Sequence, residues 1–229
     1  MIFERLAFLA VIILAISSLF LLLNQNWRWS IVALAAQYLA VFWLVAIIWP
    51  LGLAMVKLVA GWMAGVVLGA SRPLPAQVED RYTTNATFVF RLLLASVVWI
   101  MVALAAPNLV KTLDIPLPVA QGTMLLVGMG LLHLGITTRP LRVLLGLLTV
   151  LAGFELVYAA LETSVMVAGL LAVVTLGLAL VGAYLLDMDS GYAAQNPGDE
   201  GLPEALQAGG AGHVEAARGQ DFSTRRDGQ

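Results

Sequence analysis

The chain has 229 residues, of which 61% are hydrophobic and only 11% are charged. Soluble domains contain about 45–50% apolar and about 25% charged residues. A single soluble core cannot bury so large an apolar fraction, so the composition predicts an integral membrane protein that contacts the lipid bilayer. The same composition excludes a disordered regulator, a nucleic-acid-binding protein with a basic face and, because cysteine is absent, a secreted disulfide scaffold.

Seven segments are long enough to cross a bilayer, which requires about 20 mostly apolar residues. They lie near 6–23, 29–49, 51–70, 88–106, 120–137, 140–160 and 164–186. We therefore predict an all-α membrane protein whose polytopic bundle of about seven transmembrane helices spans residues 1–186. The charges of Glu4 and Arg5 cancel and no A-x-A-like cleavage site follows, so we interpret the first segment as an uncleaved anchor.

Two boundaries are visible in the sequence. The nearly continuous apolar stretch 29–70 is broken by Trp49-Pro50-Leu51-Gly52. Proline disfavours helix at the preceding residue and glycine permits a turn, so we predict a tight hairpin there. The region 187–229 is rich in Gly, Ala, Asp, Glu and Gln, and it has little to bury. We predict that it is a disordered tail.

The arginine and lysine residues near the helix ends predict the orientation, because cytoplasmic loops carry the excess of these residues. Seven crossings place Arg5, Lys57 and Lys111 on one side. The other side receives Arg28, Arg72, Arg81, Arg91, Arg139 and Arg142. This second side is predicted to be cytoplasmic. The N-terminus then lies outside the plasma (inner) membrane and the tail lies in the cytoplasm.

Ionisable residues inside a membrane are costly and need an explanation. Lys57 lies about 9 Å inside the third segment at 1.5 Å per residue. It begins a stripe that continues with Gly61, Gly65 and Gly69, a spacing that lets another helix approach closely. Lys57 either pairs with an acidic residue or extends to the outer interface, and we favour the second interpretation.

Glu155 lies in the sixth segment at about 10 Å from its outer end by the same rise, a depth similar to that of Lys57. A Lys57–Glu155 pair would lower the cost of both charges. A carboxyl group removed from water can also exchange protons near neutral pH. Both a proton site and a structural glutamate that joins two helices stay open. Glu155, Tyr158 and Glu162 share a face toward the outer end of the segment.

Two further features of the fifth and sixth segments concern packing. Gly146, Thr149 and Gly153 form a small-residue face that does not include Glu155, so the sixth helix needs partners on two sides. His133 lies near the inner end of the fifth segment. We favour a hydrogen bond from His133 to a neighbouring helix, and keep a proton relay as the alternative.

The sequence offers little support for catalysis or for a bound cofactor. No G-x-S-x-G motif, Walker loop, dinucleotide fingerprint or pair of intramembrane aspartates occurs, and His133 is the only histidine in the membrane. Without cysteine or a second intramembrane histidine, the chain lacks the usual ligands for haem, zinc or iron–sulfur clusters. We predict no catalytic residue, no metal and no cofactor.

One part of the chain resembles a known family. A glycine-rich helix is followed by the basic turn Thr137-Thr138-Arg139-Pro140-Leu141-Arg142, then by Gly146-Leu147-Leu148-Thr149, a helix with Glu155 and a last apolar helix. The stretch 125–186 thus resembles the K-type subunit of respiratory complex I, the C subunit of Mrp-type antiporters and component E of membrane hydrogenases such as hydrogenase-4. The family's second glutamate is absent, and Thr175 is the only polar non-glycine residue well inside the last helix.

This resemblance implies a non-catalytic membrane subunit of a proton- or cation-translocating complex, with other membrane subunits as partners. It implies a proton-transfer role for Glu155, to which Lys57 and His133 are added here as candidates from their position in the membrane. The alternative is a structural or assembly membrane protein without an ion pathway, in which the Gly61, Gly65 and Gly69 stripe is a docking surface. A stand-alone transporter is the third interpretation, although neither internal repeats nor interrupted helices are evident.

Overall fold

The computed structural model describes residues 2–24, 26–71, 85–137, 139–162 and 164–195, and they form seven α-helices and no strand. Each helix is long and apolar enough to cross a membrane. The predicted all-α, multi-pass architecture is therefore confirmed. The helices are α1 (Ile2–Leu23), α2 (Trp27–Val45), α3 (Leu51–Ala70), α4 (Asn85–Leu113), α5 (Leu117–Ile136), α6 (Pro140–Leu161) and α7 (Val165–Gln195).

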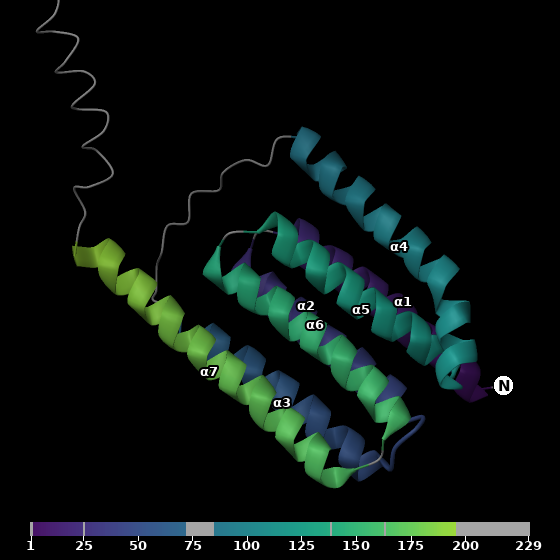
Figure 1. Cartoon of the computed structure of the whole chain (residues 1–229). Coiled ribbons are helices and arrows are strands. Elements are labelled where there is room, and N and C mark those ends of the chain that lie inside the picture. The colour runs from purple at the N-terminus through teal and green to yellow at the C-terminus, as the bar shows by residue number, and fades with distance from the viewer. Residues whose placement is uncertain (1, 25, 72–84, 138, 163, 196–229) are drawn as a thin grey trace, which may run out of the picture. The chain divides into compact units, whose positions relative to one another are not determined.

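Four helices form the centre of the compact unit Met1–Asp187. α1 packs against α2 and α5, and α6 packs against α2 and α5. α4 covers α1 and α5 on one side, whereas α3 packs on α2 (Figure 1). α7 lies beside α3 and α6, where Gly182 faces Leu144 and Leu68. α7 therefore completes the bundle next to α3 and α6.

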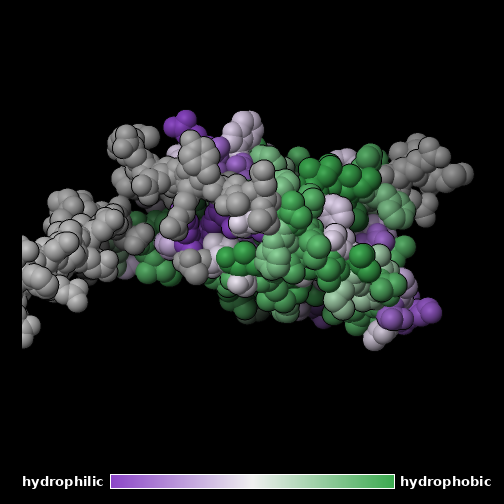
Figure 2. Space-filling model, turned by 90° about the horizontal axis from the view of Figure 1, so that it is seen from above, coloured by the Kyte–Doolittle hydropathy of each residue, from purple (hydrophilic) through white to green (hydrophobic). Residues whose placement is uncertain are grey.

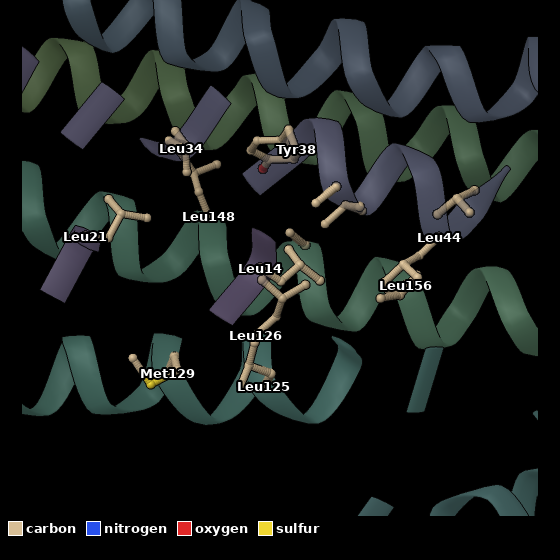
Figure 3. Close-up of a cluster of buried hydrophobic side chains, with 14 of the residues drawn as sticks. Leu14, Leu21, Leu34, Tyr38, Leu44, Leu125, Leu126, Met129, Leu148 and Leu156 are labelled. Carbon is tan, nitrogen blue, oxygen red and sulfur yellow. The ribbon is translucent and has the colours of Figure 1, made fainter. Parts of the chain in front are cut away.

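The core between the four central helices consists mainly of leucine side chains (Figure 3). Leu14, Leu34, Leu126, Leu148 and Leu156 are each completely buried. Large apolar side chains are nevertheless exposed on every helix, in the largest number on α4 and α7. Apolar residues cover most of the visible face in Figure 2, and hydrophilic residues gather toward its two ends. A lipid bilayer solvates such a surface, whereas water does not.

The turn between α2 and α3 is where the sequence predicts it, but α2 ends earlier than expected. The predicted helix reached residue 49, whereas α2 ends at Val45. The amide of Ile48 bonds to the carbonyl of Val45 at 2.9 Å, a tighter i→i+3 contact. Pro50 disfavours helical geometry at Trp49, so the last turn tightens before α3 begins at Leu51.

The predicted end of the fourth helix at residue 106 is wrong, because α4 continues through Pro107 to Leu113. A proline removes one backbone hydrogen bond and bends a helix, but the neighbouring bonds can continue it. The ribbon of α4 bends toward its C-terminal end (Figure 1). α4 stops at Asp114, which adopts φ 51° and donates its amide to Val110 at 2.9 Å. Aspartate is one of the few residues that tolerate this left-handed geometry.

The last helix is also longer than predicted. The tail was expected to begin at residue 187, whereas α7 continues to Gln195. No proline interrupts the chain before Pro197, and alanines at 193 and 194 favour helix. The apolar span itself ends at Met188, so the extra turns are polar. The predicted disordered region 196–229 lies outside the described residues.

Candidate functional site

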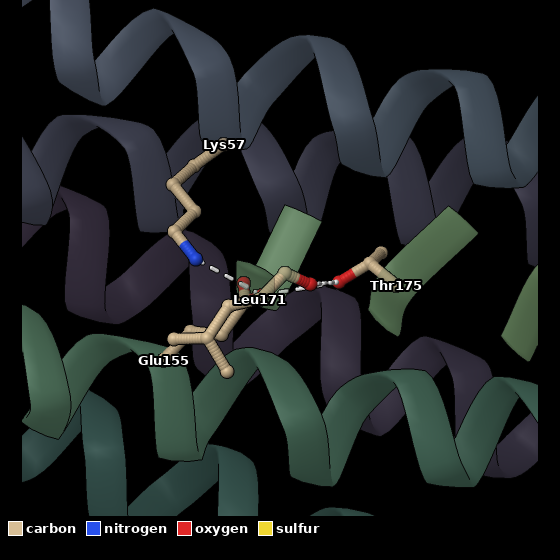
Figure 4. Close-up of polar contacts among 4 residues, drawn as sticks. All are labelled: Lys57, Glu155, Leu171 and Thr175. Atoms are coloured by element: carbon tan, nitrogen blue, oxygen red, sulfur yellow. Dashed lines mark hydrogen bonds and ion pairs between the residues drawn. The ribbon is translucent and has the colours of Figure 1, made fainter. Parts of the chain in front are cut away.

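Lys57 of α3 and Glu155 of α6 form an ion pair inside the bundle. Lys57 Nζ lies 3.0 Å from Glu155 Oε1, and each side chain is only 2% exposed (Figure 4). The interpretation that Lys57 extends to the outer interface is therefore wrong. Burying either charge alone would be very unfavourable, and the opposite charge within contact distance offsets much of that cost.

Antiparallel geometry brings the two residues together. Lys57 follows the first residue of α3, Leu51, by six positions, and Glu155 precedes the last residue of α6, Leu161, by six positions. Both ends lie at the same face of the bundle, because successive helices reverse direction. The two charges are thus at one depth, about 9 Å from the helix ends at 1.5 Å per residue, as the sequence predicts.

Thr175 of α7 is the third member of this site, although the sequence predicts no role for it. Its Oγ1 lies 3.0 Å from Glu155 Oε1 and 3.0 Å from the carbonyl oxygen of Leu171. Figure 4 shows Lys57 and Thr175 approaching Glu155 from two different helices. The available signal was its position as the single polar non-glycine residue inside an apolar helix. We call Lys57, Glu155 and Thr175 the buried triad.

Two polar residues of α2 add to the hydrophilic character of the interior. Tyr38 is 1% exposed, and its ring packs against Gly61 one turn beyond Lys57. Gln37 is completely buried. Neither the Tyr38 hydroxyl nor the Gln37 amide has a hydrogen-bond partner among the described residues. Such groups are uncommon in a purely structural core.

The exposure of polar groups increases along α6 from Glu155 toward the end of the helix. Glu155 is buried, Tyr158 is half-buried and Glu162 is exposed. Tyr158 lies three positions after Glu155 within α6, whereas Glu162 follows the last helical residue, Leu161, and has extended backbone.

His133 does not belong to this site. It lies three residues before the end of α5 at Ile136, at the opposite end of the bundle from Glu155. It is 4% exposed, and its Nε2 has no hydrogen-bond partner among the described residues. The expected hydrogen bond from His133 to a neighbouring helix is thus not observed at this nitrogen.

The glycines predicted to pack helices contact two different neighbours within the chain. Gly61, Gly65 and Gly69 face α2 through Tyr38, Ile31 and Leu34. The stripe is therefore covered by this chain's own α2, and the interpretation of it as an open docking surface is wrong.

Gly146 and Gly153 instead face α5. Glu155 contacts α3 and α7 through Lys57 and Thr175, so α6 does have partners on two sides.

No group of three metal-ligating side chains occurs within the part of the chain that the structure describes. The chain matches no protein-family model, no curated protein and no solved structure. The buried triad is therefore the feature from which a function has to be inferred.

Proposed function

We propose that the protein is a non-catalytic membrane subunit of a proton- or cation-translocating complex, and that Glu155 is its proton-accepting group. The observation that carries the proposal is the placement of the Thr175 hydroxyl, 3.0 Å from both Glu155 Oε1 and the Leu171 carbonyl oxygen. This placement provides a hydrogen-bond partner for Glu155 in both of its protonation states.

In the ionised state, an ion pair and a hydrogen bond stabilise the carboxylate. Lys57 Nζ lies 3.0 Å from Oε1, and Thr175 donates its single hydroxyl hydrogen to the same oxygen. Hydrogen bonds to a charged group are stronger than those between neutral groups. The triad therefore stabilises a carboxylate at a depth where water is scarce.

In the protonated state, the carboxyl group becomes a donor. A hydroxyl carries one hydrogen and two lone pairs, so Thr175 can rotate that hydrogen toward the Leu171 carbonyl and accept the hydrogen of Glu155. No backbone movement is required. A glutamate that serves only to join helices needs a partner in one state alone.

Protonation of Glu155 promotes the release of a proton from Lys57. When Glu155 gains a proton, Lys57 retains a buried charge without its counter-ion, which is strongly unfavourable. The ammonium group regains a low-cost state by releasing a proton, and this yields a neutral amine and a neutral carboxylic acid. Arrival of a proton at Glu155 thus drives departure of a proton from Lys57. The buried Tyr38 hydroxyl, next to Gly61, is a neighbouring polar group.

The proposal that the protein belongs to an ion-translocating complex rests on a resemblance. Residues 125–186 resemble K-type subunits of complex I and their antiporter and hydrogenase relatives. That resemblance suggests antiporter-like membrane subunits as partners. The arginine bias of the loops suggests an N-terminus outside the plasma membrane and a cytoplasmic C-terminal tail.

The decisive experiment measures proton translocation in inverted membrane vesicles from cells that carry the variant chain in its native assembly. We expect Glu155→Gln to reduce the translocation rate at least tenfold at normal abundance, because the amide binds no proton. Glu162→Gln, an exposed glutamate of the same region, is the matched control and keeps the wild-type rate. Thr175→Ser keeps most of the rate, whereas Thr175→Val loses it.

Two outcomes would overturn the proposal. The first is an assembled Glu155→Gln variant that translocates protons at the wild-type rate. The second is full activity in the double variant Lys57→Met/Glu155→Met, which removes both ionisable groups while avoiding an unpaired charge. That result would assign the ion pair a structural role and support the alternative of an assembly protein without an ion pathway.

A further inference from the structure

A second group of charged side chains lies at the end of the bundle opposite the buried triad. Arg91 of α4, His133 of α5, Arg142 of α6 and Arg139, which directly precedes α6, come together where α1 ends. We call these four residues the basic cluster. It shares no residue with the buried triad, so a role for the cluster does not depend on the proposed proton pathway.

Two hydrogen bonds hold arginines of the cluster against the C-terminal end of α1. Arg91 Nη1 donates to the carbonyl oxygen of Leu22 at 3.2 Å, and Arg142 Nη2 donates to that of Asn24 at 3.1 Å. These acceptors lie two residues apart at the C-terminal end of α1. The last carbonyl groups of a helix lack partners within the helix and carry a partial negative charge, which attracts cations.

The positive charges of the cluster are close to one another and are not neutralised. Arg142 is within electrostatic range of Arg91 and Arg139. Within the described part of the chain, none of the three arginines forms an ion pair with a carboxylate. An anion that joins such guanidinium groups lowers the repulsion between them.

Hydrogen-bond donors also remain unused in the cluster. A guanidinium group has five N–H donors, and Arg91 and Arg142 each use one in the bonds to α1. Arg91 Nε is enclosed and has no partner among the described residues. The same holds for Nε2 of His133, whose side chain is 4% exposed. The half-buried guanidinium groups of Arg91 and Arg142 therefore offer both charge and further N–H donors to an oxyanion.

The depth of the cluster matches that of lipid headgroups. Arg142 follows the start of α6 by two residues, His133 precedes the end of α5 by three, and Arg91 follows the start of its span at Thr87 by four. These offsets correspond to at most about 6 Å at 1.5 Å per residue. Next to Arg91, the side chains of Phe88 and Leu92 are exposed apolar surface on α4, where acyl chains can lie.

We propose that the basic cluster binds the phosphate group of an anionic phospholipid of the leaflet that adjoins the C-terminal end of α1. The phosphate oxygens accept hydrogen bonds from Arg91 and Arg142, and the acyl chains pack against the exposed face of α4. Basic pockets between membrane helices recognise anionic headgroups through this combination of charge and donors.

Native mass spectrometry of the purified full chain tests the proposal, with phosphatidylglycerol and phosphatidylcholine as probes. We expect the first phosphatidylglycerol to bind at least about tenfold more tightly than phosphatidylcholine, because the arginines of the cluster attract the net negative charge of its headgroup. Equal binding of the two lipids by the wild-type chain would overturn the proposal without any variant being needed.

Variants then locate the site. Arg91→Gln/Arg142→Gln keeps hydrogen-bond donors near α1 but removes two charges, and we expect it to lose most of the preference. Arg28→Gln is the matched control, because Arg28 is exposed at the same end of the bundle. An equal loss in Arg28→Gln would place the preference outside the cluster. Competition by millimolar inorganic phosphate would show that the site takes a free anion rather than a lipid, and would also overturn the proposal.

Discussion

Lys57 and Glu155 each expose only 2% of their side chain, so the stability of this pair depends on both charges being present together. A lone charge left in the interior costs several kcal/mol, while an apolar pair of similar volume costs little. The Thr175 hydroxyl lowers the cost further by donating to the carboxylate. Replacing one member of the pair should therefore lower the free energy of unfolding much more than replacing both members.

We predict that Lys57→Met destabilises the folded chain by about 3–5 kcal/mol, because Glu155 stays buried without a counter-ion. Lys57→Met/Glu155→Met should be within about 1 kcal/mol of the wild type or more stable than it. Equilibrium unfolding of the full chain in mixed detergent micelles, followed by tryptophan fluorescence, measures both. Lys111→Met, at an exposed position of α4, is the control. A double variant as unstable as the single one would contradict the prediction.

At the same scale, the sequence predicts some site residues and misses others. Counting residues from the helix ends placed Lys57 and Glu155 at one depth, because the rise per residue of a helix is constant. It could not assign Thr175 to Glu155 or place Tyr38 near it. Those contacts depend on which faces of α7 and α2 turn inward, and helices that are apolar all round do not mark that face.

The helices pack at two different distances, and their glycines show where the contact is closest. A Cβ atom built on Gly153 would lie 2.9 Å from Leu126 Cβ and 3.0 Å from the backbone nitrogen of Val127. On Gly65 its nearest neighbours would be Ile31 and Leu34 at 3.8 and 3.9 Å. Thus α5 and α6 leave no room for a side chain, whereas α2 and α3 do at this point.

We predict opposite effects of the same substitution at these two glycines. Gly153→Ala should destabilise the chain by about 1–3 kcal/mol, because the backbone of α5 has to move. Gly65→Ala should be neutral or stabilising by up to about 1 kcal/mol, because alanine favours helix over glycine. Thermal unfolding of the purified full chain compares the two variants. A Gly65→Ala variant that unfolds as early as Gly153→Ala would refute the assigned packing.

Helix ends are the elements that the sequence predicts least well. α4 passes Pro107, and α7 passes residue 187 into polar sequence. In α7 the apolar span ends at Met188, whereas the helix continues to Gln195. Hydropathy reports which residues prefer lipid, whereas helix ends depend on backbone geometry such as the positive φ of Asp114.

For the whole molecule, the seven candidate spans and the apolar surface around them require a bilayer. Each crossing takes the chain to the other side, so successive turns lie on alternating sides of that bilayer. Asn24 and Thr137 then lie on one side, and Asp114 and Glu162 lie on the other. The arginine bias proposes the first side as cytoplasmic.

We predict that single cysteines at positions 24 and 137 react with a membrane-impermeant maleimide only in inverted vesicles. Cysteines at positions 114 and 162 should react only in intact cells. The natural chain contains no cysteine. No native cysteine therefore has to be replaced, and the natural chain is itself the unlabelled control. The reverse pattern would show that the arginine bias misleads here, and labelling of positions 24 and 114 from one side would contradict the crossing pattern.

Residue order alone indicates that the chain crosses a membrane, roughly where it does so, and which charges must be sheltered from lipid. These properties depend on the length and apolarity of each segment and on the constant rise per residue of a helix, all of which can be read from the sequence. Three features emerge only from the packed helices: Glu155 meets both Lys57 and Thr175, α2 covers the glycine stripe, and a basic cluster forms where α1 ends. Each of these depends on the rotation of apolar helices about their axes, which side-chain packing selects and uniform hydropathy does not encode.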